Sequence, residues 1–235
     1  DSISEGNPKN VIAFVKREMG KNVELSLGNK KMSPEEVSAE ILKYIKNYSE
    51  EFLGEKIKKA VITVPANFGN DRRNATLKAG ELAGLDVVKI INEPTAAALA
   101  YCMENTGGDE LIKVMVYDLG GGTFDVTIGE FNNGVLDVLG GDGDDELGGK
   151  DFDNMLIDYL SEEFLKEHGI DLRDDDSLRF RLSRAAEKAK KTLSSRDNVD
   201  VAIPFLTAKD GKPLGINTSL TRESFEGLIS EKLNG

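Results

Sequence analysis

The stretch from residue 112 to residue 131, IKVMVYDLGGGTFDVTIGEF, predicts two strands joined by a glycine-rich turn. The segment 114–117 before the turn is apolar and β-prone, which is typical of a strand covered on both faces. After the turn, apolar and polar residues alternate from 124 to 129, the period of a half-buried strand. We therefore expect a β-hairpin at the centre of the fold, closed by the three glycines at 120–122.

The turn carries groups suited to a phosphate and a metal ion. Glycine adopts φ above 0° freely and leaves the backbone open to a ligand, so the N–H groups can cradle a polyphosphate. The expected phosphate contacts are Gly120, Gly121, Gly122 and the hydroxyl of Thr123. Asp118 and Asp125 flank the turn, and carboxylates suit this place only if a hard cation such as Mg²⁺ separates them from phosphate. The alternative is a glycine-rich hairpin with solvated aspartates, which the full DLGGGTFD pattern after an apolar strand disfavours.

Composition narrows the class of protein. The chain has 235 residues, 39% of them hydrophobic and 31% charged, and this is the composition of an ordinary soluble α/β protein. The net charge of −12 argues against nucleic acid or a membrane as partner. Cys102 is the single cysteine, which favours a small core residue and a reducing, cytoplasmic compartment. His168 is the single histidine, which excludes the usual zinc sites and any Ser/His/Asp triad.

Strand and helix patterns alternate along the chain, which indicates the α/β class. We expect helices over 8–20, 34–54, 70–84, 93–105, 150–168 and 176–195, and a last one capped by Thr221. Strands are expected over 22–27, 60–65 (a buried strand), 86–92, 135–140 and 200–206, with a hinge-like break at 106–109 and an acidic glycine loop at 140–149. The second helix has the clearest start, a capping box of Ser33 and Glu36 around Pro34. Its apolar face is expected to comprise Val37, Ile41, Leu42, Ile45, Tyr48 and Phe52.

Three segments together resemble the 70-kDa heat-shock chaperone family, which belongs to the actin, sugar-kinase and heat-shock ATPase superfamily. They are VYDLGGGTFDVTI (116–128), AVITVPANFGNDRRNATLKAGELAGLDVVKIINEPTAAALAYCME (60–104) and RLSRAAEKAKKTLSSR (181–196). The resemblance covers essentially the whole chain. It implies an actin-like ATPase fold of two ribonuclease-H-like lobes, incomplete here, that binds ATP or ADP with Mg²⁺ and admits K⁺ as a second cation.

The resemblance implies roles for acids near the turn. Glu93 stands at the end of a strand and the start of a helix, where ligand sites of open α/β sheets gather. The alternative is that Glu93 has no role in a site and is only a first-turn acid that the helix dipole stabilises. By the resemblance, Glu93 holds a water of the magnesium shell, while Asp118 and Asp125 bind the metal (Asp125 through a water) and orient the attacking water. Catalysis would then rest on Glu93, Asp118 and Asp125 through positioning and charge stabilisation.

Two further groups of residues match family positions. Pro65 and Arg73 match a proline–arginine relay from the nucleotide to the substrate domain; the alternative for Pro65 is a strand terminator. Lys89 stands where many relatives carry an arginine that contacts a J-domain co-chaperone, so that contact is in doubt. The basic segment 181–196 reads by itself as a solvated helix face. The resemblance instead implies that it grips adenosine through Glu187, Lys190, Lys191 and Ser194, the first two on the ribose, Lys191 on the adenine and Ser194 at the base edge.

The acidic loop fits neither of two other phosphate or metal motifs. An EF-hand loop would need glycine where Leu147 stands, and a Walker A loop would need Ser or Thr where Asp151 stands. The resemblance places Gly149 near the nucleotide phosphates. Relatives commonly have Thr-His where Asp145 and Glu146 stand, so we expect the two acids to weaken nucleotide affinity through repulsion.

The resemblance also implies a subdomain plan and a larger parent protein. It assigns 1–33 to part of a peripheral subdomain of lobe I, 34–108 to the lobe I core, 109–147 to the lobe II core, 148–224 to the adenosine-gripping subdomain of lobe II, and 225–235 to a return helix. The first phosphate loop with its lysine, a second adenosine loop and the peptide-binding domain are expected outside the chain, so these 235 residues alone should hydrolyse ATP poorly.

The expected parent is an ATP-dependent heat-shock chaperone of the stress response. It would bind and release unfolded polypeptides, with a J-domain co-chaperone and a nucleotide-exchange factor as partners. Two alternatives remain: a sugar or acetate kinase of the same superfamily, and a nucleotide-sensing relative that does not hydrolyse ATP. The presence of Glu93, Asp118 and Asp125 disfavours the second.

Overall fold

The computed structural model describes residues 10–105 and 111–234. The chain divides into two compact units, Ile12–Gly148 and a second unit that holds the helices and strands from Gly149 onward. Each unit is described by itself. The division follows residue 148, and the finer subdomain assignment stays a prediction.

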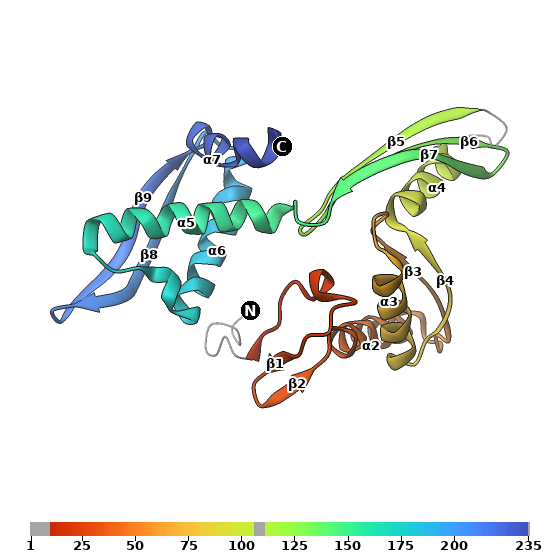
Figure 1. The fold of residues 1–235 in the computed structure, drawn as a ribbon, viewed down its shortest axis with the longest axis horizontal. Helices are drawn as coiled ribbons and strands as arrows, with labels where there is room; N and C mark the ends of the chain where they lie inside the picture. Colours follow the sequence, from red (N-terminus) through yellow and green to blue (C-terminus); the bar gives the residue numbers. More distant parts are fainter. Residues whose placement is uncertain (1–9, 106–110, 235) are drawn as a thin grey trace. The chain divides into compact units, whose positions relative to one another are not determined.

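The first unit combines small sheets with three α-helices (Figure 1). In chain order its elements are η2 (Val15–Glu18), β1 (Leu25–Leu27), β2 (Lys30–Met32), α2 (Pro34–Leu53), β3 (Lys59–Val64), α3 (Asn70–Leu82), β4 (Asp86–Asn92), α4 (Glu93–Asn105), β5 (Ile112–Leu119), β6 (Phe124–Asn132) and β7 (Val135–Asp144).

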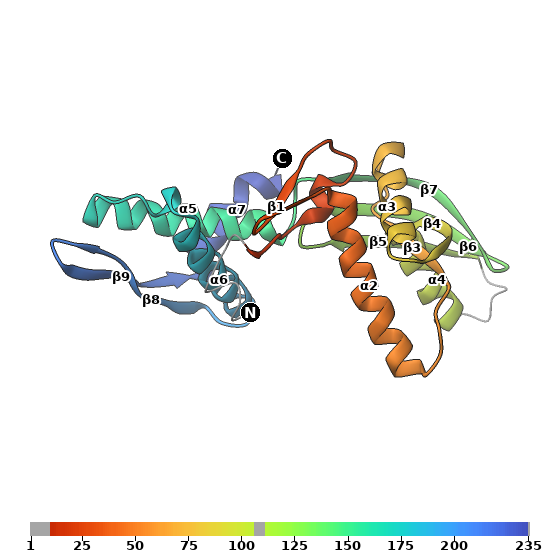
Figure 2. The same ribbon diagram turned by 90° about the horizontal axis from the view of Figure 1, so that it is seen from below.

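Strands β3 and β4 are parallel and are connected through α3, which lies beside them in both views (Figures 1 and 2). The helix approaches closely because Gly80 has no side chain: a Cβ there would meet the side chains of Val87 and Ile62. A small core of Met19, Val64, Phe68, Ala75 and Ala79 fills the space between these elements. This packing fixes the ends of β3 and β4, which are followed by the loop 65–69 and directly by α4.

Strands β5, β6 and β7 form an antiparallel sheet in sequence order, with α4 packed against it. The predicted hairpin around the glycine turn is confirmed, with Leu119 opposite Phe124 and Asp118 opposite Asp125. The turn between β6 and β7 also agrees with its Asn-Gly signal, because Asn133 and Gly134 have φ of 50° and 76°. Cys102 on α4 is fully buried, as expected for a core residue.

In the second unit, the residues from Gly149 to Asn234 pack three α-helices with a long hairpin. Its elements are α5 (Gly149–His168), η3 (Leu172–Asp174), α6 (Asp176–Leu193), β8 (Asn198–Lys209), β9 (Lys212–Thr221) and α7 (Arg222–Asn234). Helix α5 contributes a buried stripe of Phe152, Leu156, Ile157, Leu160 and Phe164, and α6 faces it with Leu182, Ala186, Ala189 and Leu193. The predicted cap of α7 is confirmed by a hydrogen bond from the Ser224 N–H to Thr221 Oγ1 of 3.1 Å.

Helix α2 begins and ends as predicted but does not pack as predicted. The capping box is present, with Glu36 N donating to Ser33 Oγ at 3.3 Å and Ser33 N donating to Glu36 Oε2 at 2.8 Å. Four residues of the expected apolar face are exposed instead, namely Ile41, Ile45, Tyr48 and Phe52. Helical spacing defines an apolar stripe, but it does not say which part of the stripe another element of the chain covers.

Three other expectations for the first unit, Ile12–Gly148, are wrong. The helix predicted over 8–20 is reduced, among the described residues, to the short η2, because Phe14 adopts a left-handed φ of 59° that a helix cannot accommodate. The strand before the glycine turn is covered on one face only: Met115 and Tyr117 are 66% and 62% exposed, because the described residues leave open the face of β5 that carries these two side chains. Val61 on β3 is likewise 54% exposed, although that strand was expected to be buried.

The acidic glycine loop is shorter than expected because β7 continues to Asp144. Gly141 and Gly143 allow this, since a Cβ at either would collide with a backbone carbonyl of β6. The connection to the next helix is thus reduced to residues 145–148. The hinge-like break expected at 106–109 lies outside the described residues.

Glu50 at the end of α2 gives a first prediction, for stability. Its side chain is 8% exposed and accepts from Lys56, Lys46 and the Ile57 N–H, which together lower its pKa from 4.5 to about 2. The lowered pKa means that the fold favours the ionised form, so this contribution is complete above pH 4.5 and is lost as the pH falls towards 2.

We therefore expect Glu50→Gln to lower the free energy of unfolding at pH 7, and the difference from wild type to shrink below pH 4.5. Denaturant unfolding at several pH values measures this, with the exposed neighbour Glu51→Gln as control. A difference that stays constant down to pH 2 would contradict the assignment.

Candidate functional site

The glycine turn lies between β5 and β6 and is closed by a hydrogen bond from Gly120 N to Thr123 O of 2.9 Å. The expectation of positive φ here is wrong, because none of the three glycines has φ in the left-handed range. What the glycines provide is access: no heavy atom lies within 4 Å of a Cβ built at Gly121. Thr123 is buried at the end of the turn.

Asp118 and Asp125 lie side by side because they are directly opposed residues of an antiparallel pair, whose side chains share one face of the sheet. Asp125 is 2% exposed, and its Oδ1 accepts a hydrogen bond from Ala66 N at 3.2 Å. Burial raises its pKa above the ordinary value, the negative charges of Glu93, Asp118 and Asp145 add to this, and only the Ala66 N–H opposes it. The position therefore favours a cation.

Glu93 is the first residue of α4, directly after β4, as the sequence indicated. Its carboxylate is 23% exposed and binds Lys16, whose Nζ lies 2.9 Å from Oε1 and 3.0 Å from Oε2. Sequence reasoning missed Lys16, because it assigned the segment to an amphipathic helix and expected the lysine of the site outside the chain. The signal was available: Lys16 and Arg17 are adjacent cations in a largely acidic chain.

Arg17 holds the glycine turn from the side of η2. Its Nε and Nη2 donate to the carbonyl of Gly122 at 3.0 and 2.7 Å. Two consecutive basic residues thus contact the start of α4 and the turn. Neither contact could be read from the sequence, since the partners are 77 and 105 residues away.

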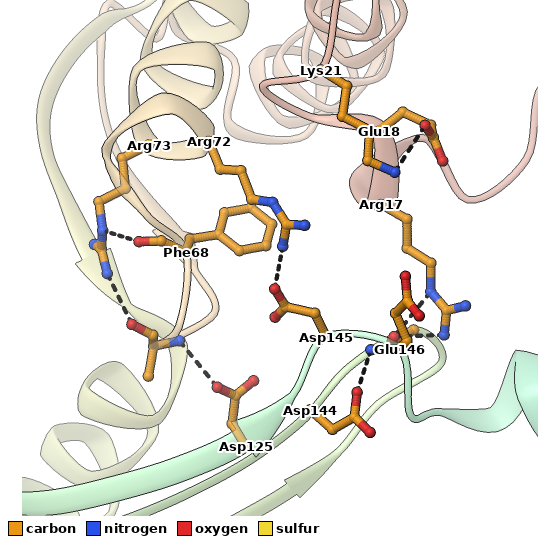
Figure 3. A network of polar contacts seen from close by, with 12 residues as sticks. Arg17, Glu18, Lys21, Phe68, Arg72, Arg73, Asp125, Asp144, Asp145 and Glu146 are labelled. Carbon is orange, nitrogen blue, oxygen red and sulfur yellow. Dashed lines mark hydrogen bonds and ion pairs between the residues drawn. The ribbon is translucent and has the colours of Figure 1, made fainter. Parts of the chain in front are cut away.

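Arg73, one of the two residues of the expected relay, lies close to Asp125 of the site (Figure 3). Arg73 donates from Nε to Phe68 O at 2.7 Å, and from Nη2 to Asn92 Oδ1 at 2.7 Å and Ala66 O at 3.2 Å. Pro65 is fully buried and precedes Ala66, whose N–H contacts Asp125. A continuous series of contacts therefore runs from α3 through the loop after β3 to Asp125.

Asp145 does not carry an isolated charge, which revises the expectation of repulsion. Its Oδ2 forms an ion pair with Nη1 of Arg72, the residue before Arg73 on α3 (Figure 3). Only Glu146, which is exposed, keeps the character of an added negative charge in this connection.

In the second unit the four expected adenosine contacts are spaced i, i+3, i+4 and i+7, with Ser194 as the C-cap of α6. Glu187 and Lys191 form an ion pair of 2.6 Å, which lowers the pKa of Glu187 and raises that of Lys191. Both line a groove between α6 and β8 whose other charged residues are Arg181, Arg184, Lys188 and Arg196.

The other two contacts are directed differently. Lys190 donates to Gly149 O at 2.7 Å and lies 2.8 Å from Asp153, whose pKa is raised mainly by burial. Lys190 thereby joins α6 to the start of α5. Ser194 donates to Lys190 O at 3.4 Å at the end of α6. Lys190 and Ser194 therefore belong to the helix end rather than to the groove.

The acids near the turn were tested as a metal site. Within residues 10–105 and 111–234, no group of three or more His, Cys, Asp or Glu side chains is arranged to hold a metal ion directly. Asp125, with a raised pKa and acidic neighbours, suits a cation that is reached through water molecules. The donor set therefore fits a hydrated Mg²⁺ better than a dehydrated one.

The chain is similar in sequence to known proteins. A family model described as "Hsp70 protein" matches residues 3–234. The chain is 51% identical over 226 residues to the chaperone protein DnaK of Thermotoga petrophila, and equally to that of Thermotoga maritima; each alignment covers 96% of this chain and 38% of the relative. DnaK of Thermosipho melanesiensis is 50% identical over 225 residues, with 96% and 37% covered.

The mixed α/β units and the glycine turn belong to the class of actin-like ATPase folds, the fold of the Hsp70 nucleotide-binding domain. The chain belongs to the Hsp70 family. It spans about 38% of the length of the curated relatives that it matches. None of the described helices is long and apolar enough to cross a membrane.

Proposed function

We propose that this chain is part of the nucleotide-binding, ATP-hydrolysing domain of a chaperone that binds and releases unfolded polypeptides. The family membership supports the class, and the relatives it matches are named as chaperones. The observation that carries the proposal is the buried Asp125 beside Asp118 and near Glu93, with an open glycine turn adjoining. An acidic group next to accessible backbone suits a nucleotide phosphate brought with a divalent cation.

The residues of the turn would share the work of binding and hydrolysis. The backbone of Gly121 and Gly122 would face the phosphates, with the Thr123 hydroxyl and Gly120 completing the turn. Mg²⁺, when bound, would neutralise part of the phosphate charge. Asp118, Asp125 and Glu93 would hold its water shell and orient the attacking water, and Lys16 would stabilise negative charge that develops on the phosphate.

The second unit would supply the adenosine contacts. Glu187 and Lys191 line the groove beside α6 and would take the ribose and the adenine, while Lys190 would act through its bond to the Gly149 carbonyl. Ser194 at the end of α6 would contact the base edge. K⁺ could occupy a second cation position, which no contact of the described residues singles out.

The relay and the partners complete the proposal. Arg73 and Pro65 would transmit the state of the site to the polypeptide-binding part of the protein, through the contacts that join them to Asp125. A J-domain co-chaperone and a nucleotide-exchange factor would act on the cycle, although Lys89 leaves the J-domain contact uncertain in form. The single buried Cys102 supports a cytoplasmic, reducing location. The Hsp70 match argues against the sugar-kinase alternative.

Blocking access to the turn tests the proposal. We expect Gly121→Val to weaken Mg²⁺–ADP binding at least about tenfold without unfolding the protein, because the side chain enters open space where phosphate would bind. Gly140→Val on β7 is the control, since no atom lies within 4 Å of a Cβ built there either. Calorimetric titration of the full-length protein with ADP, with and without Mg²⁺, measures the effect. Absence of Mg²⁺-dependent nucleotide binding by the wild type would overturn the proposed function.

A further inference from the structure

Two adjacent arginines in the first turns of α3 contact different parts of the site. Arg73 reaches the loop after β3, whereas Arg72 reaches the connection after β7, residues 145–148. We propose that the Arg72–Asp145 ion pair is a latch that holds this connection against the glycine turn, which makes Arg72 a positioning residue of the nucleotide site. This inference rests on the proposed function.

Partial burial and a contact with Phe68 stabilise the Arg72–Asp145 ion pair. Both side chains are partly shielded from water, with 26% of Arg72 and 30% of Asp145 exposed. The guanidinium lies over the ring of Phe68, 5.0 Å from its centroid, and this contact restricts the rotamers of a long side chain (Figure 3). An ion pair with one partner already ordered loses less entropy on forming than a pair of free surface side chains.

The ion pair with Arg72 fixes the position of the Asp145 side chain. In the part of the chain that the structure describes, Asp145 Oδ1 is buried without a hydrogen-bond partner, while Oδ2 pairs with Arg72. Without the guanidinium, the carboxylate would be a partly buried charge with no cation, and it would turn towards water. The connection that carries it would move with it.

That movement would reach the turn through Gly148. Gly148 is buried, and its Cα lies against the peptide that joins Gly121 to Gly122: a Cβ built on it would be 2.6 Å from Gly122 N and 2.7 Å from Gly121 C. The next peptide of the turn, between Gly122 and Thr123, is held by Arg17, whose Nη2 donates to the Gly122 carbonyl at 2.7 Å. Two consecutive peptides of the turn are therefore supported, and the latch secures the support of the first.

Charge repulsion predicts the opposite behaviour of Asp145. If its charge only repelled phosphate, Asp145→Asn would tighten nucleotide binding, Arg72→Gln would weaken it, and the double variant would resemble the wild type. If the pair is a latch, both single variants weaken binding, and the double variant is no weaker than either single one, because each change already breaks the same contact. The sign of the Asp145→Asn effect separates the two models.

The experiment is a double-mutant cycle in the full-length protein, with two readouts. ADP affinity in the presence of Mg²⁺ is expected to fall about fivefold in Arg72→Gln and in Asp145→Asn, with no further loss in the double variant and partial recovery in Arg72→Lys. Amide hydrogen exchange of residues 145–148 in the nucleotide-free protein is expected to accelerate in the same variants. Lys113→Gln with Glu130→Gln is the control, since this pair, 3.2 Å apart, joins β5 to β6 at the far end of the same sheet.

Each outcome decides a separate point. Unchanged exchange at 145–148 in both single variants overturns the latch. Faster exchange with unchanged or tighter ADP binding shows that the pair restrains the connection but does not position the site, and this also overturns the inference. If the wild type binds no nucleotide, the proposed function fails, and the positioning role of Arg72 fails with it. Faster exchange of residues 145–148 in the single variants would then still show that the ion pair restrains this connection.

Discussion

In the full-length protein, Asp125→Asn is expected to abolish most ATP hydrolysis and, at the same time, to stabilise the nucleotide-free state. Asparagine has the same shape, and its Oδ1 can still accept the hydrogen bond of the Ala66 N–H. Only the negative charge is lost, and with it the electrostatic attraction of residue 125 for a hydrated cation. We expect the turnover number to fall at least about 100-fold, the magnitude typical of removing an electrostatic group from an active site.

The gain in stability follows from the raised pKa of Asp125. Because burial and acidic neighbours favour its protonated form, ionisation opposes folding: the cost is absent below the ordinary value of 3.8 and complete above the raised pKa. The stability of metal-free wild type should therefore decline as the pH rises through that window, and Asp125→Asn should remove the decline. Exposed Asp137 on β7 gives the control variant Asp137→Asn, which should change neither property. Loss of activity together with loss of stability would indicate a merely structural role.

Lys16→Gln is expected to produce the second large effect. Lys16 binds both carboxylate oxygens of Glu93, so its ammonium lies at the acid proposed to orient the hydrated cation. We expect a decrease of about 100-fold in single-turnover ATP hydrolysis, because a fixed cation near a transferring phosphoryl group stabilises the transition state.

Lys21→Gln is the matched control for this variant. Lys21 is as exposed as Lys16, at 46% against 47%, and pairs locally with Glu18. It should leave hydrolysis within twofold of wild type. If Lys16→Gln behaved like Lys21→Gln, the Lys16–Glu93 pair would be a surface ion pair without a part in catalysis.

The central hairpin was accessible from the sequence because its information is local. Asp118 and Asp125 lie one residue beyond the pair Leu119 and Phe124 that flanks the turn, so closure between Gly120 and Thr123 opposes them across two strands. Caps and turns were equally local: Ser33 with Glu36, and Asn133 with Gly134, act within four residues. The three segments that carry the family resemblance all lie within the residues that the family model matches.

The remaining features depended on contacts distant in the chain. Lys16 meets Glu93 across 77 residues, and Arg72 meets Asp145 across 73, so no periodicity could reveal either pair. The helix expected over 8–20 failed for a different reason, since the left-handed Phe14 interrupts a segment with adequate helical propensity. The apolar runs of β3 and β5 predict coverage on both faces, whereas within the described residues one face of each strand is open.

The burial of Cys102 gives the molecule an internal reporter. Since the chain has one thiol, and α4 keeps it at 0% exposure, alkylation can proceed only when that helix separates from its surroundings. The labelling rate under native conditions therefore measures the opening equilibrium of the helix whose first residue is Glu93. The factor by which a nucleotide slows alkylation would thus measure, without any introduced probe, how much ligand binding stabilises the closed state of this helix.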